Sequence, residues 1–179
     1  MKKKITLIIF ITLTIVIQSL STFINIGGFP VSLSMIPIII GGALFGTGFG
    51  SLLGLIFGII VSLTVLTGFD PTGTVMFSIH PFITIGICLI KGLAAGFVSS
   101  LLYKIIDNKK IAIIISAISA TITNTLLFLI TLSLFFDSSF SIVISTLLSI
   151  NFLIEIMVNT IISPTCLYII INKKHRFEY

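Results

Sequence analysis

Charged residues are scarce in this sequence. They make up 8% of its 179 residues, whereas an average soluble domain is about 25% charged. Ten Lys and Arg and five Asp and Glu cannot cover the surface of a soluble chain in which 56% of the residues are hydrophobic. The composition therefore excludes soluble enzymes, nucleic-acid-binding modules and disordered tails, and it indicates an integral membrane protein.

Motifs for metal, nucleotide or nucleophilic chemistry are absent as well. The two histidines are far apart in the sequence, and the glycine-rich run 46–54 is neither preceded by a strand nor followed by a Lys. The two cysteines, Cys88 and Cys166, lie in apolar segments, where thiols usually act as small packing residues. We therefore expect no enzymatic activity, no metal and no cofactor.

Apolar segments long enough to cross a bilayer recur along the whole sequence. A membrane-spanning helix needs roughly 20 apolar residues, so this length accommodates about six helices with short connections. The predicted fold is an all-α, integral membrane six-helix bundle, a single transmembrane domain over 1–179 without an extramembrane domain. The helices are expected at about 5–24, 32–45, 50–67, 82–106, 111–135 and 143–171.

The first apolar segment has some features of a secretion signal, because residues 2–4 are lysines and residues 19–21 imitate a cleavage site. Its apolar run is about 20 residues long, however, whereas a signal core usually has about 7–15. We therefore expect it to be retained as the first helix.

Cationic residues are distributed on one side of this predicted topology. Nine of the ten lie within residues 2–4, 104–110 and 173–176, and these segments share one side of a six-helix chain. The loops expected on the other side contain no Lys or Arg. The positive-inside rule then places both termini in the cytoplasm.

Glycines mark expected breaks between helices and also recur at regular spacing within them. Residues 46–48 predict a tight turn or an interrupted helix, while 25–31 and 68–81 are expected to be loops, the longer one a lid that dips toward the membrane. Small residues also recur every fourth position, which creates flat helix faces for close packing in the bundle or for a partner. They are Gly42, Gly46, Gly50, Gly54, Gly58 and Ser62, and then Gly92, Gly96 and Ser100.

Two ionisable residues fall near the middle of predicted helices. Lys91 and Glu155 would each cost about 2.5–3.5 kcal/mol if they faced lipid, so both should face the bundle interior. They could neutralise one another as an ion pair, contact a polar solute, or relay protons. A Lys in a pocket suits a solute carboxylate as a point charge with three donors.

Other polar residues lie at a similar depth. Asn151 and Asn159 are four positions before and after Glu155, so the three share a helix face, and Asn124 lies within the fifth helix. Each Asn could bond a neighbouring helix or line a cavity. His80 lies at the outer entrance of the fourth helix, as a solvated residue or a contact for solute.

Two glycine-containing segments resemble the substrate-binding S components of energy-coupling factor (ECF) vitamin transporters. One is residues 36–46 followed by Gly50 and Gly54, and the other is residues 90–96, with a basic residue and a glycine as in pantothenate-type members. The pair 124–125 and the region around Glu155 are also similar. The resemblance covers roughly residues 32–170. S components have six helices and cytoplasmic termini.

The resemblance also implies partners. S components bind a vitamin from outside and dock on a membrane coupling subunit with two cytoplasmic ATPases, whose ATP hydrolysis drives release inside. The loops 25–31 and 68–81 would gate the pocket. The first helix lacks the alanines with which many members dock, and the basic position is Lys91 where the resemblance predicts Arg.

The predicted function is therefore a high-affinity solute-binding subunit in a bacterial plasma membrane. Pantothenate is favoured, because Lys91 can hold its carboxylate while Asn124 and Asn159 bond hydroxyl or amide groups; Glu155, Asn151 and His80 complete the candidate site. Riboflavin is an alternative, since sixteen Phe offer stacking surface. Two further alternatives are an ion- or proton-coupled carrier using Glu155 and Lys91, and a non-transporting membrane assembly protein.

Overall fold

The computed structural model describes residues 2–23, 25–26, 29–30, 32–136 and 150–176. Within these residues the fold is all-helical apart from a minimal hairpin, in which strand β1 (Asn25–Ile26) pairs antiparallel with β2 (Phe29–Pro30). The seven described helices are α1 (Lys2–Ser21), α2 (Met35–Phe45), α3 (Thr47–Leu66), α4 (Pro71–Ile79), α5 (Pro81–Ile105), α6 (Lys109–Phe135) and α8 (Ile150–Arg176).

Four helices are long and apolar enough to cross a bilayer. They are α3, α5, α6 and the stretch Phe152–Asn172 of α8, while Ile5–Ser21 and Met35–Phe45 are shorter apolar helices. All six predicted segments therefore contain a helix, which confirms the all-α class and a multi-pass membrane protein. The predicted start of the last helix, at 143, lies outside the described residues.

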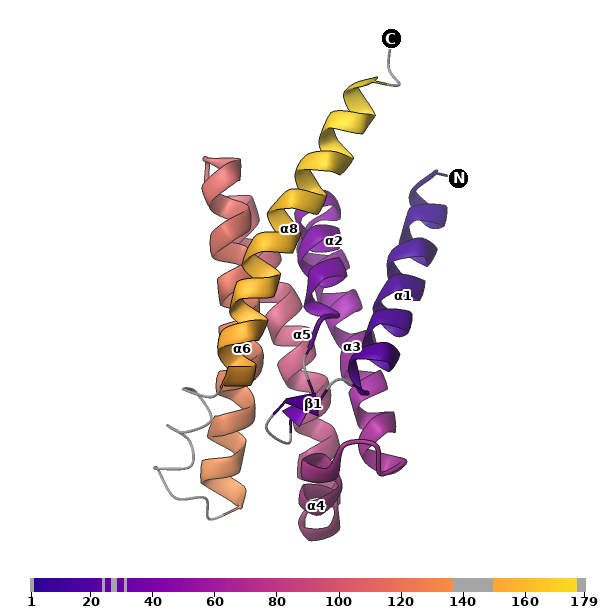
Figure 1. Cartoon of the computed structure of the whole chain (residues 1–179), viewed down its shortest axis with the longest axis vertical. Helices are drawn as coiled ribbons and strands as arrows, with labels where there is room; N and C mark the ends of the chain where they lie inside the picture. Colours follow the sequence, from indigo (N-terminus) through magenta and orange to yellow (C-terminus); the bar gives the residue numbers. More distant parts are fainter. Residues whose placement is uncertain (1, 24, 27–28, 31, 137–149, 177–179) are drawn as a thin grey trace.

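The long helices run along a common axis and leave two distinct ends (Figure 1). The start of α1, the turn between α5 and α6, and the end of α8 all lie toward the same end of the bundle, so residues 2–4, 104–110 and 173–176 are at what we call the basic end. Helix α4 lies at the opposite end, called here the α4 end. The three cationic segments thus share one end of the molecule.

Helix α4 corrects one prediction, because residues 71–79 were expected to belong to a loop. Asp70 caps the helix by accepting a hydrogen bond from the Gly73 N–H at 3.0 Å, and Pro71 occupies the first turn. Both residues favour helix starts, Pro because its fixed φ suits the position and it has no N–H to leave unpaired. Thr74 attaches this helix to α3 through a 3.0 Å bond from its hydroxyl to the Val65 carbonyl.

The interruption predicted at residues 46–48 is confirmed. Gly46 separates α2 from α3 with a φ of 92°, a left-handed conformation that favours glycine. Because α2 has only 11 residues, it begins part-way along the bundle (Figure 1). The residues just before it are consequently surrounded by α1 and α8 at the middle of the molecule.

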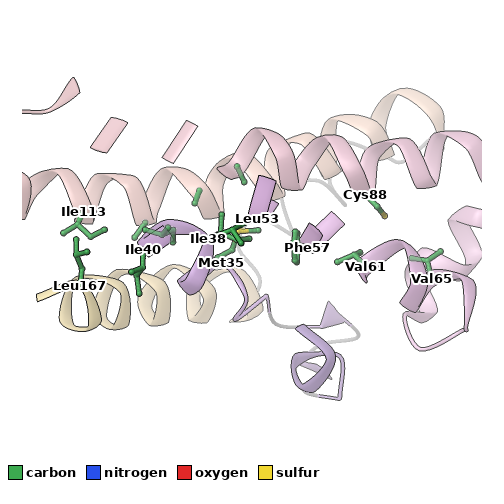
Figure 2. Packing of buried hydrophobic residues seen from close by; sticks show 14 residues of the cluster. Met35, Ile38, Ile40, Leu53, Phe57, Val61, Val65, Cys88, Ile113 and Leu167 are labelled. Atoms are coloured by element: carbon green, nitrogen blue, oxygen red, sulfur yellow. The ribbon is translucent and has the colours of Figure 1, made fainter. Parts of the chain in front are cut away.

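The core follows the contact between α3 and α5. Figure 2 shows Leu53, Phe57 and Val61 of α3 along this contact, with Met35 and Ile38 of α2 beside them. The backbones approach so closely that a Cβ added at Gly54 would collide with the Gly92 carbonyl oxygen. Apart from Gly46, which meets nothing within 4 Å, the glycines of the series lie at close contacts inside the bundle, as the packing interpretation predicts.

Candidate functional site

The beginning of α2 is held by side chains from two other helices. The Ser32 N–H donates to Oε1 of Glu155 in α8 at 2.7 Å, and the Ser34 hydroxyl donates to Oε1 of Gln18 in α1 at 2.7 Å. Glu155 and Gln18 are 5% and 3% exposed. Ser32 and Ser34 precede the first residue of α2, so these two bonds attach the segment that leads into the helix to α8 and to α1.

Lys91 lies near the middle of α5, next to α6. It is half-buried, and its Nζ is 5.0 Å from the centre of the Phe128 ring. The ammonium is within electrostatic range of Glu155, yet the two side chains form no ion pair in the described structure. Of the roles that the sequence allowed, the direct ion pair is therefore not formed, and the cation rests on an aromatic face instead.

Asn159 connects α8 to α6. Its Nδ2 donates to the Thr121 hydroxyl at 2.9 Å, and Thr121 in turn donates to the Ala117 carbonyl. The two helices run in opposite directions and pack against each other (Figure 1). Glu155, one turn before Asn159, therefore lies at the level of Asn124, about one turn after Thr121.

Several buried polar atoms of this region have no hydrogen-bond partner in the described structure. Leaving such an atom unpaired costs about 1–3 kcal/mol, so native proteins usually provide a partner. The two amide oxygens are pure acceptors on residues that are 6% and 1% exposed. These unpaired atoms are Oδ1 of Asn124, Oδ1 of Asn159, Oγ of Ser116, Oγ1 of Thr160 and Oγ of Ser163.

Lys91, Asn124, Glu155 and Asn159 are the polar residues of the candidate site, which we call the polar cluster; Lys91 contacts Phe128, Glu155 binds the Ser32 N–H, and Asn159 binds Thr121. The polar cluster combines one cation, one carboxylate and two unpaired amide oxygens within a largely apolar interior. Such a set can bind a small polar solute that has an anionic group and several hydrogen-bond donors. Among the described residues, no group of three or more His, Cys, Asp and Glu could hold a metal.

Two predicted site residues are not part of this cluster as described. His80 is exposed between α4 and α5, where its ring lies 5.4 Å from the Phe136 ring. Eleven positions separate it from Lys91, which corresponds to about 16 Å along a helix. The side chain of Asn151 lies outside the described residues.

Comparison with known sequences identifies the family. A model of the family described as "ECF transporter, substrate-specific component" matches residues 2–171. The chain belongs to this family. The S-component resemblance found in the sequence is thereby confirmed, and the family is one of transporter subunits and not of enzymes.

One curated relative of this S component comes from Lactococcus lactis subsp. cremoris (strain MG1363). It is named "Pantothenic acid transporter PanT" and is 31% identical over 172 residues. The match covers 88% of this chain and 87% of the relative, so it extends over most of both chains.

Sequence reasoning overlooked several residues around the cluster in this S component. Ser163 continues the series Glu155 and Asn159 at the same four-residue spacing, so extending that series would have found it. Thr121 and Phe128 gave no such signal, because a Thr or a Phe in an apolar helix is common. Only the packing of α6 against α5 and α8 shows that Thr121 binds Asn159 and that Phe128 contacts Lys91.

Replacing Glu155 by Ala is expected to destabilise the S component. Without the carboxylate the Ser32 N–H loses its acceptor, at a cost of about 1–3 kcal/mol, which lowers Tm by about 2–12 °C in a chain of this size. Glu155→Gln keeps an acceptor oxygen and should lose less than half as much. Thermal unfolding of both variants in detergent, without added solute, measures the difference. An equal loss in both would instead assign the stability to the charge of Glu155.

Proposed function

We propose that this S component binds pantothenate and presents it for import. The observation that carries the proposal is the 31% identity, over most of both chains, to a protein named as a pantothenic acid transporter. The chemistry of the polar cluster supports it independently. Pantothenate has one carboxylate, two hydroxyls and one amide, and the cluster offers one cation and unpaired acceptor oxygens.

Each group of the solute has a proposed partner. The Lys91 ammonium binds the carboxylate, to which it offers three donors without the paired geometry of an Arg. The free Oδ1 atoms of Asn124 and Asn159 accept hydrogen bonds from hydroxyl or amide groups, which removes the cost of leaving them unpaired. Binding therefore gives these two oxygens hydrogen bonds that the described residues do not provide.

Glu155 is proposed to orient the solute in the site. Its Oε1 accepts a hydrogen bond from the Ser32 N–H, and we propose that the carboxylate also accepts one from a solute hydroxyl. Its charge disfavours a second carboxylate nearby, which orients the acid group of the solute toward Lys91. Asn151 shares the helix face of Glu155 and remains a candidate contact. His80 is proposed to lie on the entry route and not in the site.

The proposed topology follows from the two ends of the molecule. Six helices, α1, α2, α3, α5, α6 and α8, form the membrane domain, and the basic end with both termini faces the cytoplasm of a bacterial cell. The hairpin β1–β2 and α4 then lie on the outer side, where they cover the approach to the site. A membrane coupling subunit and two ATPases supply the energy.

Solute analysis tests the function directly. Full-length protein is purified in detergent without dialysis, and small molecules released by denaturation are identified by mass spectrometry. We expect pantothenate at close to one per chain, and we expect calorimetric titration of solute-free protein to give saturable one-to-one binding of pantothenate but none of riboflavin. Stoichiometric riboflavin, or absence of pantothenate binding in folded protein, contradicts the proposal. Uptake that persists in cells without the ATPase pair would favour a stand-alone carrier.

A further inference from the structure

A largely apolar groove lies near the basic end, away from the polar cluster. It encloses about 280 Å³ between the last turn of α5, the first turns of α6 and the second half of α8. Ile113 and Leu167 face each other across this contact (Figure 2). Ile114 and Ile171 extend the apolar wall and remain 40% and 37% exposed. The groove therefore opens on the surface of the bundle.

Two lysines line this groove, and they differ in their hydrogen-bond partners. Nζ of Lys109 donates to the carbonyls of Tyr103 and Ile106 at 3.0 and 2.8 Å, so its charge stabilises the end of α5. The Lys110 ammonium has no partner in the described part of the chain, and its side chain is exposed. A free cation thus stands at the edge of an apolar groove.

We propose that an anionic phospholipid occupies this groove, with an acyl chain along Ile114 and Ile171 and its headgroup phosphate at Lys110. The proposal rests on the membrane orientation proposed above, which places the basic end at the inner leaflet. Basic pockets between membrane helices at this depth suit phosphate headgroups. The site is separate from the solute site, so neither requires the other.

Charge complementarity selects this occupant. An acyl chain gains no hydrophobic energy on moving from the bilayer into an apolar groove. The groove therefore contributes a complementary shape for the chain, and the Lys110 ammonium provides the preference for an anionic headgroup. A soluble anion would meet mostly apolar walls, and a zwitterionic lipid would bring its own cation to Lys110. Tyr103 and Tyr168 also line the groove, and a Tyr hydroxyl can donate to a phosphate oxygen.

Lipid counting tests the proposal. Full-length protein is reconstituted in nanodiscs of equal parts phosphatidylglycerol and phosphatidylcholine, released into mild detergent and weighed by native mass spectrometry. We expect one retained phosphatidylglycerol per chain in preference to phosphatidylcholine. Lys110→Gln should reduce the retained fraction about fivefold, as expected for one cation at a membrane surface. Ile171→Trp, which fills the groove, should reduce it as well.

Lys104→Gln is the matched control, because Lys104 is an exposed cation at the same end that does not line the groove. It should leave retention unchanged. Equal retention of both lipids, unchanged retention in Lys110→Gln, or an equal loss in Lys104→Gln would overturn the proposal. Because the readout needs no solute, it is independent of whether the protein binds pantothenate.

Discussion

Replacing Lys91 by Met is expected to weaken pantothenate binding by about 10- to 150-fold. The variant keeps a long side chain on α5 but removes the cation that we place against the carboxylate. A hydrogen bond to a charged group contributes about 1.5–3 kcal/mol, which corresponds to that range of dissociation constants. Calorimetric titration of detergent-purified, solute-free protein measures it.

The neutral analogue in which an alcohol replaces the carboxylate identifies the group that Lys91 binds. The natural protein should prefer pantothenate to this analogue by about the same 10- to 150-fold. Lys91→Met should bind the two compounds nearly equally, while Lys91→Arg keeps the charge and should retain much of the preference. If Lys91→Met still discriminates like the natural protein, the carboxylate binds elsewhere.

The thermal stability of the Lys91→Met variant distinguishes a solute-binding role of Lys91 from a purely structural one. If Lys91 only neutralised Glu155, its removal would leave a buried carboxylate uncompensated and would destabilise the protein strongly. The ammonium instead lies 5.0 Å from the centre of the Phe128 ring without an ion pair to Glu155 in the described structure. We therefore expect the Tm of solute-free Lys91→Met to be equal to that of the natural protein or higher.

Replacing Gly54 by Ala is expected to be among the most damaging small substitutions in the membrane domain. The added Cβ would collide with the carbonyl oxygen of Gly92 and lie 2.8 Å from its carbonyl carbon. Both are backbone atoms, so α3 and α5 must separate along their whole contact. Overpacking costs about 1–3 kcal/mol, sometimes more, which corresponds to a Tm lowered by about 2–12 °C. Gly54→Leu should yield no monodisperse protein.

Two other glycines of the same helices provide matched controls. A Cβ at Gly48 of α3 or Gly86 of α5 would meet nothing within 4 Å. Because Ala favours a helix over Gly, Gly48→Ala and Gly86→Ala should leave Tm unchanged or raise it. Thermal unfolding of the three Ala variants in one detergent compares them. A loss at Gly48 equal to that at Gly54 would show that helix flexibility, and not close packing, is what these glycines provide.

Local chemistry determined much of the fold from sequence alone. Few charges and long apolar runs require helices that satisfy their own backbone in lipid, so all six predicted segments contain helix. The grouping of lysines at three chain positions predicted that these positions share one end of the molecule, and they do (Figure 1). Gly46 likewise indicated the break between α2 and α3, because the turn there requires a positive φ that glycine adopts readily. Helix α4 was not predicted, because the turn residues of 68–81 favour a loop, although Asp70 and Pro71 together form a helix start.

Tertiary structure decided which polar groups meet. The sequence predicted that Lys91 and Glu155 lie near the middle of their helices but left their partners open, since the rotation of each helix about its axis is set by packing with its neighbours. The close contact of α3 with α5 and the antiparallel pairing of α6 with α8 fixed those rotations. They bring Lys91 to Phe128, Glu155 to Ser32 and Asn159 to Thr121. Sequence thus determined where each polar residue lies along the chain of helices, and only the packing of the helices determined what it faces.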